Sequence, residues 1–154
     1  MSSNKSHATK ERRKQAGNAI DRLLEQRQKV LVHYERVTGV QPYDDDPPSP
    51  ELLEQFFQLL MDYIASGHFG LYQRITEGTE RRQNVIEIAE DIYPKIAVTT
   101  EKALDFNDAY DKADKSAPFD SLVGGLSQLG EVLAYRIELE DELIAVMLTP
   151  GENG

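Results

Sequence analysis

Apolar residues recur at helical spacing along most of the chain, and no stretch alternates strictly between apolar and polar positions as a strand would. Between residues 18 and 38, and again from residue 50 onwards, apolar side chains return every three or four positions. The stripe over 85–110 is the cleanest, and another follows over 119–147. This spacing places one face of a helix against a core. The chain is therefore predicted to be all-α, with four long amphipathic helices.

Proline and glycine mark the connection between the first two helices. Gly39 ends the first helix at a position where a left-handed cap is common. The proline-rich segment 40–50 is predicted to be a loop, because each ring removes a backbone donor and biases its predecessor away from helical geometry. Ser49 is the expected cap of the second helix, with Pro50 at its first position.

Two further loops complete the predicted layout, at residues 76–80 and 111–118. Long helices joined by short loops pack antiparallel to their neighbours. We therefore expect an antiparallel four-helix bundle with short additional helices. The predicted divisions of the chain are a basic flexible tail at 1–17, a helical-bundle domain at 18–148 and a C-terminal coil at 149–154.

Glycine and proline also interrupt the predicted helices. At Gly67 the apolar phase is broken, which predicts a break or sharp bend followed by a short helix to about Ile75. Pro94 lies inside its stripe without disturbing the phase, so it is expected to kink that helix rather than end it. Glycines inside the last helix indicate either close packing of a neighbouring helix or a bend, and both alternatives stay open. They are Gly124, Gly125 and Gly130.

Three charged residues fall on stripes that are otherwise apolar. Arg136 and Glu140 are four positions apart and can pair along one helix, and Arg27 can join them from the first helix. The favoured interpretation is an internal ion-pair network that fixes the register of the helices. The alternative is that these groups line a groove at one end of the bundle. Asp141 and Glu142 are expected to face water.

Charge is unevenly distributed along the chain. The formal net charge is −10, with a pI near 4.7. Residues 1–17 carry a local charge of +4, so the remainder carries −14. An acidic body repels nucleic-acid phosphates and attracts a basic partner, although for acidic proteins in general solubility is the favoured interpretation. We interpret the basic tail as a short solvated arm and expect no direct binding of nucleic acid.

Composition excludes several classes of chemistry. The chain has no cysteine, which rules out disulfides, thiolate catalysis and cysteine-ligated metal centres. It shows no signal peptide and no membrane span, so a soluble cytoplasmic protein is expected. No glycine-rich phosphate loop, serine–histidine–acid pattern or pair of catalytic carboxylates is found. A binding module is favoured over an enzyme, and no cofactor is expected.

The stretch "MDYIASGHFGLYQRI" (61–75) places a polar cluster inside an apolar run. His68 has three interpretations: a structural hydrogen-bonding residue, a metal ligand, or the phosphate acceptor of a histidine phosphotransfer bundle. A metal-dependent bundle enzyme is the least favoured, because such sites use Glu-x-x-His pairs from two helices and this chain has none. Phosphotransfer through His68 stays open as the alternative function.

Asp62 lies in the same stretch, between the hydrophobic residues Met61 and Tyr63. A surface carboxylate with apolar neighbours is a good anchor for an arginine of a partner protein. An ordinary exposed acid is equally compatible with the spacing.

The stretch "DYIASGHFGLY" (62–72) resembles the signature of the Rsd/AlgQ family of bacterial regulators of the primary sigma factor. Further segments agree with the family in order and spacing, and together they span about residues 18–148. They are "IDRLLEQR" (20–27), "LLEQFFQLLMDY" (52–63), "IYPKI" (92–96), "ALDFN" (103–107) and "YRIELEDELI" (135–144).

The resemblance implies an all-helical bundle that binds the C-terminal, promoter-reading domain of the primary (sigma-70-type) sigma factor. That domain is a basic helix-turn-helix module, which agrees with the acidic body. Binding would keep sigma from core RNA polymerase and from the −35 promoter element in stationary phase, by occlusion and without a reaction. Some members of the family also bind a phosphocarrier protein or a stringent-response enzyme, and no residue of this chain decides whether it does so.

The resemblance also implies which residues contact sigma. Asp62 matches the family aspartate that pairs with a sigma arginine, and Ala65 and Ser66 are the small residues in the reverse of the usual order. Leu23 stands where tryptophan is usual and Gln73 where glutamate is usual, which predicts an effect on affinity rather than on the class of partner. The expected sigma-binding patch consists of Asp62, His68, Phe69, Leu23, Arg27 and Ser66.

Overall fold

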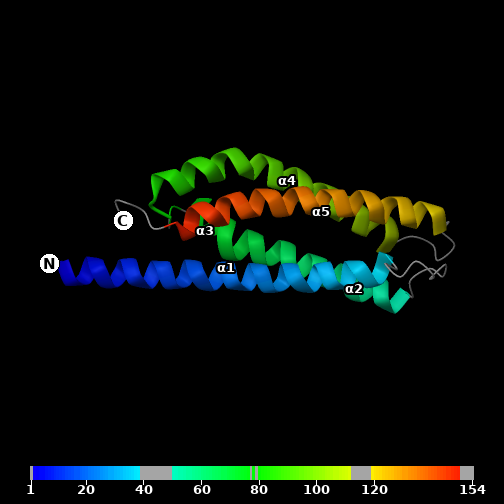
Figure 1. The fold of residues 1–154 in the computed structure, drawn as a ribbon, viewed down its shortest axis with the longest axis horizontal. Helices are drawn as coiled ribbons and strands as arrows, with labels where there is room; N and C mark the ends of the chain where they lie inside the picture. Colours follow the sequence, from blue (N-terminus) through cyan, green and yellow to red (C-terminus); the bar gives the residue numbers. More distant parts are fainter. Residues whose placement is uncertain (1, 39–49, 77, 79, 112–118, 150–154) are drawn as a thin grey trace.

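The computed structural model describes residues 2–38, 50–76, 78, 80–111 and 119–149, and these form helices and short connections with no strand. Each long helix runs opposite to the one before it (Figure 1). The predicted all-α, antiparallel four-helix bundle is confirmed. The elements are α1 (Ser2–Thr38), α2 (Pro50–Ala65), the π-helix η1 (Ser66–Tyr72), α3 (Gln73–Thr76), α4 (Gln83–Asp111) and α5 (Phe119–Leu148). The predicted features at Gly39, Ser49, 112–118 and 150–154 lie outside the described residues.

The bundle is built from two helical hairpins that share one core. α1 packs along α2 and η1, and α4 packs along α5 (Figure 1). The apolar stripes predicted from the 4–3 spacing point inwards, so burial of each stripe against the others stabilises the bundle. The most deeply buried members of the core are Leu23, Val30, Phe56, Leu60, Tyr63, Leu71, Val85, Ala89, Ile92 and Leu143.

The N-terminal part of α1 differs from the prediction. Residues 2–17 were expected to form a flexible tail, but α1 is a single helix from Ser2 and extends past the ends of the other helices (Figure 1). The segment contains no proline and is rich in lysine and arginine, which favour helix. Ala16 is already buried at the end of the bundle. The boundary at residue 18 therefore marks where the apolar stripe begins, not where the helix begins.

The expected break at Gly67 is also wrong, because the chain stays helical there through one widened turn. Ser66–Tyr72 form a π-helix in which the Gln73 amide donates to the His68 carbonyl, five residues earlier. Gly67 is buried, and a Cβ on it would lie 3.0 Å from Tyr72 Cε2 and 3.5 Å from Leu23 Cδ1. The glycine thus permits close packing in the widened turn, and the short helix predicted to follow it is α3.

Pro94 lies inside α4 without ending it, as predicted, and α4 is bowed (Figure 1).

In α5, the glycines serve different purposes. A Cβ on Gly130 would lie 2.9 Å from Tyr34 Cζ, and the Tyr34 hydroxyl donates to the Leu126 carbonyl at 2.8 Å. Gly124 has nothing within 4 Å of such a Cβ. Close packing of a neighbouring helix therefore explains Gly130 but not Gly124.

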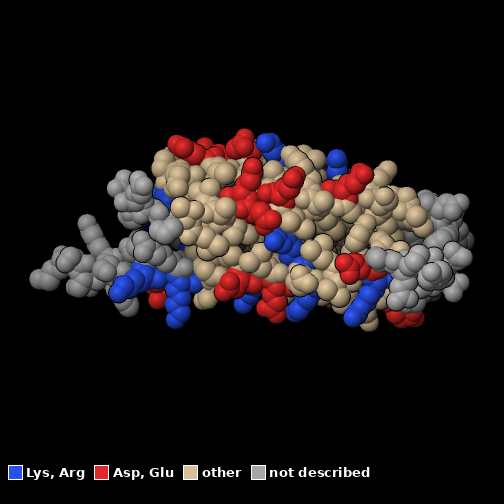
Figure 2. Space-filling view, viewed as in Figure 1, with Lys and Arg blue, Asp and Glu red and all other residues tan. Residues whose placement is uncertain are grey.

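Opposite charges are concentrated on different helices. α1 contains nine Lys and Arg against four Asp and Glu, whereas the rest of the chain contains eight against 23. Figure 2 shows acidic groups gathered over the middle of one face and basic groups along the N-terminal part of α1. The exposed acids of α4 and α5 are Glu87, Glu90, Asp91, Glu101, Asp105, Asp108, Glu131, Glu138, Asp141 and Glu142. No helix in the described segments combines the length and apolarity that crossing a membrane requires.

Candidate functional site

Glu140 is the centre of a polar network inside the bundle, and its side chain has no exposed surface. Its Oε1 accepts a hydrogen bond from the Tyr63 hydroxyl, and Arg27 Nη1 lies 3.6 Å from the same oxygen. Its Oε2 accepts from Arg136 Nε at 3.2 Å and from the Tyr72 hydroxyl at 3.3 Å. Side chains from α1, α2, η1 and α5 therefore meet at this one carboxylate.

Arg136 extends the network to α4. Its side chain is 2% exposed, and its Nη1 donates to the Thr100 hydroxyl at 2.7 Å and to the Thr99 hydroxyl at 3.2 Å. Its Cζ lies 5.3 Å from the centroid of the Tyr63 ring, within the range of a cation–π contact. The internal network predicted for the two arginines and the glutamate is confirmed, and it joins all four long helices.

Arg27 connects this network to the surface. Its side chain is 16% exposed, and its Nη1 donates to Asp141 Oδ1 at 2.9 Å. Asp141 and Glu142 are both exposed, as predicted. Arg27 is therefore engaged with α5 and balances the buried Glu140 from the solvent side.

Burial sets the protonation states of these groups. Burial, followed by the nearby Glu140 charge, raises the pKa of the Tyr63 hydroxyl and that of the Tyr72 hydroxyl. Both phenols thus keep their protons and donate to the carboxylate. Burial also raises the pKa of the Glu140 carboxyl, against the opposing effects of Arg136, the Tyr63 hydrogen bond and Arg27. The carboxylate depends on these partners in place of water.

A second set of contacts fixes the π-helix against α4. The Tyr93 hydroxyl donates to the Tyr72 carbonyl at 2.6 Å, and the two rings meet edge to face with centroids 5.2 Å apart. On the other side, a Cβ on Gly70 would lie 3.9 Å from Ala19 Cβ on α1. The π-helix is therefore held from both sides, and such segments are frequent at functional sites.

Four of the predicted sigma-binding residues lie on α2 and the π-helix. Asp62, His68 and Phe69 are exposed, and Ser66 is half-buried. Phe69 is 65% exposed, and the His68 ring meets it edge to face with centroids 4.8 Å apart. Asp62 makes no ion pair with any described residue. We call Asp62, Ser66, His68 and Phe69 the π-helix patch, in which an accessible carboxylate accompanies an accessible aromatic ring.

The remaining two predicted residues do not belong to that surface. Leu23 is fully buried beneath the π-helix, so it supports the patch by packing and does not present an anchor to a partner. Arg27 pairs with α5, as described above. The expectation that Tyr63 flanks Asp62 on the surface is also wrong, because Tyr63 is fully buried. In a helix, residues next to each other in sequence point about 100° apart.

Sequence reasoning missed the tyrosines and the two threonines of the network. Tyr63 was expected to flank Asp62 on the surface, Tyr72 was counted among the apolar residues, and Tyr93 was not singled out. The available signal was chemical, because a buried tyrosine hydroxyl usually finds a hydrogen-bond partner. Two tyrosines and two arginines near one glutamate position would have indicated a larger network. Thr100 carried no such signal.

The fold defines a helical bundle that presents an exposed patch of acidic, polar and aromatic side chains. Among the described residues, no three His, Cys, Asp or Glu side chains come together as a candidate metal site. The exposed position of His68 is compatible with a binding role and with phosphotransfer. What is specific to this surface is an exposed acid on α2 and an exposed aromatic ring on the π-helix, with a buried ionic network beneath them.

Comparison with known proteins places this helical bundle in a family. The family described as "Regulator of RNA polymerase sigma(70) subunit, Rsd/AlgQ" matches residues 2–148. "Regulator of sigma D" of Enterobacter sp. (strain 638) is 33% identical over 132 residues, which cover 84% of this chain and 79% of the relative. The protein of the same description from Escherichia coli O139:H28 is 31% identical over 144 residues, covering 90% and 89%. The chain belongs to the Rsd/AlgQ family of regulators of the sigma(70) subunit.

Proposed function

We propose that this protein is an anti-sigma factor that binds the C-terminal, promoter-reading domain of the primary sigma factor. Family membership supports a role towards sigma(70). The observation that carries the finer proposal is the π-helix patch, where Asp62 and Phe69 are both exposed. An exposed carboxylate and an exposed aromatic ring in one patch are the kinds of group that recognise an arginine and its apolar surroundings.

The proposed mechanism is occlusion. A sigma domain held on the π-helix patch cannot use the same surfaces to bind core polymerase or the −35 element. The acidic helices α4 and α5 attract a basic domain from a distance and repel DNA. The buried network contributes by holding η1 and α2 in one position, so that the patch is already formed before binding. We propose that the complex frees core polymerase for other sigma factors in stationary phase.

The proposal is tested by isothermal titration calorimetry, in which the isolated C-terminal domain of the cognate sigma factor is titrated into the protein. We expect saturable 1:1 binding, and we expect the bound domain to lose its binding to −35 promoter DNA. The matched control is an unrelated acidic helical bundle, which reproduces the charge without the patch. Absence of association in dilute buffer with the folded protein would overturn the proposal.

A further inference from the structure

A cavity of about 530 Å³ opens between the π-helix and α4. Its walls include Ile64 and Ile96 and the rings of Tyr72 and Tyr93. Both rings are fixed, because the Tyr93 hydroxyl donates to the Tyr72 carbonyl and the Tyr72 hydroxyl donates to a buried carboxylate. A preformed, mostly apolar cavity of this size is typical of sites for small organic molecules.

Arg136 also lines this cavity, and it has hydrogen-bonding capacity left over. Its Nε donates to Glu140 and its Nη1 donates to two threonines. Its Nη2 donates to no acceptor among the described residues. The Arg136 side chain is only 2% exposed and lines the cavity, so an acceptor for this nitrogen can be supplied from the cavity.

The charge of the cavity is opposite to that of the molecule. Its ionisable lining consists of Arg136, His68 and two tyrosines, and no aspartate or glutamate lines it. This is notable in a chain with a formal charge of −10. Glu140, at 3.2 Å from Arg136 Nε, already offsets much of the arginine charge. A singly charged acceptor therefore fits the site better than a doubly charged phosphate.

We infer that the cavity binds a small organic carboxylate with an aromatic or aliphatic body. The carboxylate accepts hydrogen bonds from Arg136 Nη2, and the apolar body lies between Ile64, Ile96 and the two tyrosine rings. The guanidinium is held in place by Glu140, Thr99 and Thr100, so its free nitrogen is oriented before the ligand arrives. The cavity shares His68 with the π-helix patch, but the ligand binds the free protein, so its binding is measured without sigma.

The test is a titration of the isotope-labelled full chain by NMR, with phenylacetate as the probe and neutral phenylacetamide as its isostere. We expect saturable shifts at the amides of Ala97, Thr100 and Gln73, with phenylacetate binding at least about tenfold more tightly than the amide. Removing Arg136 would leave Glu140 buried without its main partner, so the blocking variant is Ala97→Trp. Ala97 is exposed, lines the cavity and takes no part in the network.

The matched control is Ala134→Trp, which adds the same ring at an exposed position of α5 that does not line the cavity. Phenylacetate shifts that vanish in Ala97→Trp and persist in Ala134→Trp support the inference. The inference would be overturned if phenylacetate and phenylacetamide bound equally tightly or if no shift saturated. It would also be overturned if inorganic phosphate bound as tightly as phenylacetate. If the wild type binds no carboxylate and Ala97→Trp loses sigma binding, the cavity receives a side chain of a partner protein. That outcome would also overturn the inference.

Discussion

At the scale of single residues, Gly67 and Gly124 occupy helical positions with opposite surroundings. A Cβ at Gly67 meets Tyr72 at 3.0 Å and Arg136 at 3.5 Å, whereas one at Gly124 meets nothing within 4 Å. We expect Gly67→Ala to lower the free energy of unfolding by about 1–3 kcal/mol. Gly124→Ala should raise it by about 0.5–1 kcal/mol, since alanine favours helix. Urea unfolding followed by circular dichroism measures both, and stabilisation by Gly67→Ala would show that the π-helix is not closely packed.

The buried network makes a second prediction at this scale. Glu140→Ala leaves Arg136 and Arg27 without their shared carboxylate, and removal of one member of a buried ionic set typically costs about 3–5 kcal/mol. The control is Glu142→Ala, an exposed acid two positions away, which should change stability by less than about 0.5 kcal/mol. Similar stabilities for the two variants would mean that Glu140 is not the centre of the network.

At the scale of elements, the connection between α3 and α4 is tied to the end of α5. Arg82 Nη1 donates to the Met147 carbonyl at 2.7 Å, and its Nε donates to Glu80 Oε1 at 3.0 Å. Basic side chains near a helix C-terminus stabilise its last carbonyls. Burial acts to raise the pKa of Glu80, but hydrogen bonds and charge from Arg82 outweigh it, and the pKa lies below its ordinary value of 4.5.

This contact predicts a pH-dependent effect of Arg82→Gln. We expect a loss of about 1–2 kcal/mol in the free energy of unfolding at neutral pH. Because the folded pKa of Glu80 is lowered, its ionised form stabilises the fold above about pH 4.5. That contribution disappears as the pH falls through the pKa of Glu80 in the folded protein. The difference between wild type and variant should therefore shrink below about pH 4.5 in urea unfolding, and a difference that grows on acidification would contradict the assignment.

Element boundaries show where sequence reasoning succeeds. The 4–3 spacing predicted the four long helices and their antiparallel order, because burial of an apolar stripe decides both. It failed at the start of α1, where helix propensity continues beyond the stripe, and at Gly67, where a widened turn replaces a break. The phase shift of that turn exposes His68 and Phe69. Leu23 was assigned to the surface by resemblance alone, and no spacing rule indicates which motif residues support a patch from below.

At the scale of the whole molecule, the separation of charge predicts a salt-dependent association. α1 is basic, and the acids of the other helices form most of the negative surface (Figure 2). Exposed charges steer a partner mainly at low ionic strength. The association rate with the sigma domain should fall by about tenfold or more between about 0.05 and 0.5 M salt, measured by stopped-flow fluorescence. An association rate that does not change with salt would contradict electrostatic steering.

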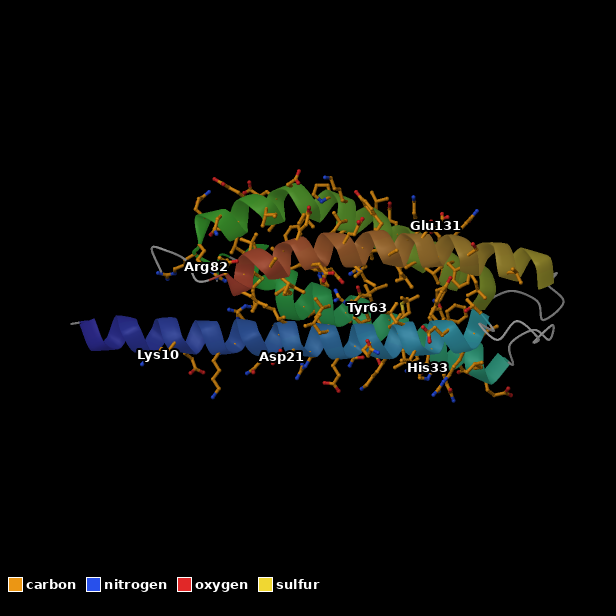
Figure 3. The ribbon with its side chains drawn as sticks, viewed as in Figure 1. Lys10, Asp21, His33, Tyr63, Arg82 and Glu131 are labelled. Atoms are coloured by element: carbon orange, nitrogen blue, oxygen red, sulfur yellow. The ribbon has the colours of Figure 1, made fainter. Side chains whose placement is uncertain are left out.

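The most direct measurement is the affinity of the sigma domain for two charge-reversal variants. Asp62→Arg alters the π-helix patch, and Asp21→Arg makes the same change at the outer edge of α1 (Figure 3). Both residues are exposed, so neither change should alter the melting temperature beyond a few degrees. Capture of sigma through the patch predicts that Asp62→Arg weakens binding about 100-fold or more while Asp21→Arg has a far smaller effect. Equal affinities for the two variants would contradict it.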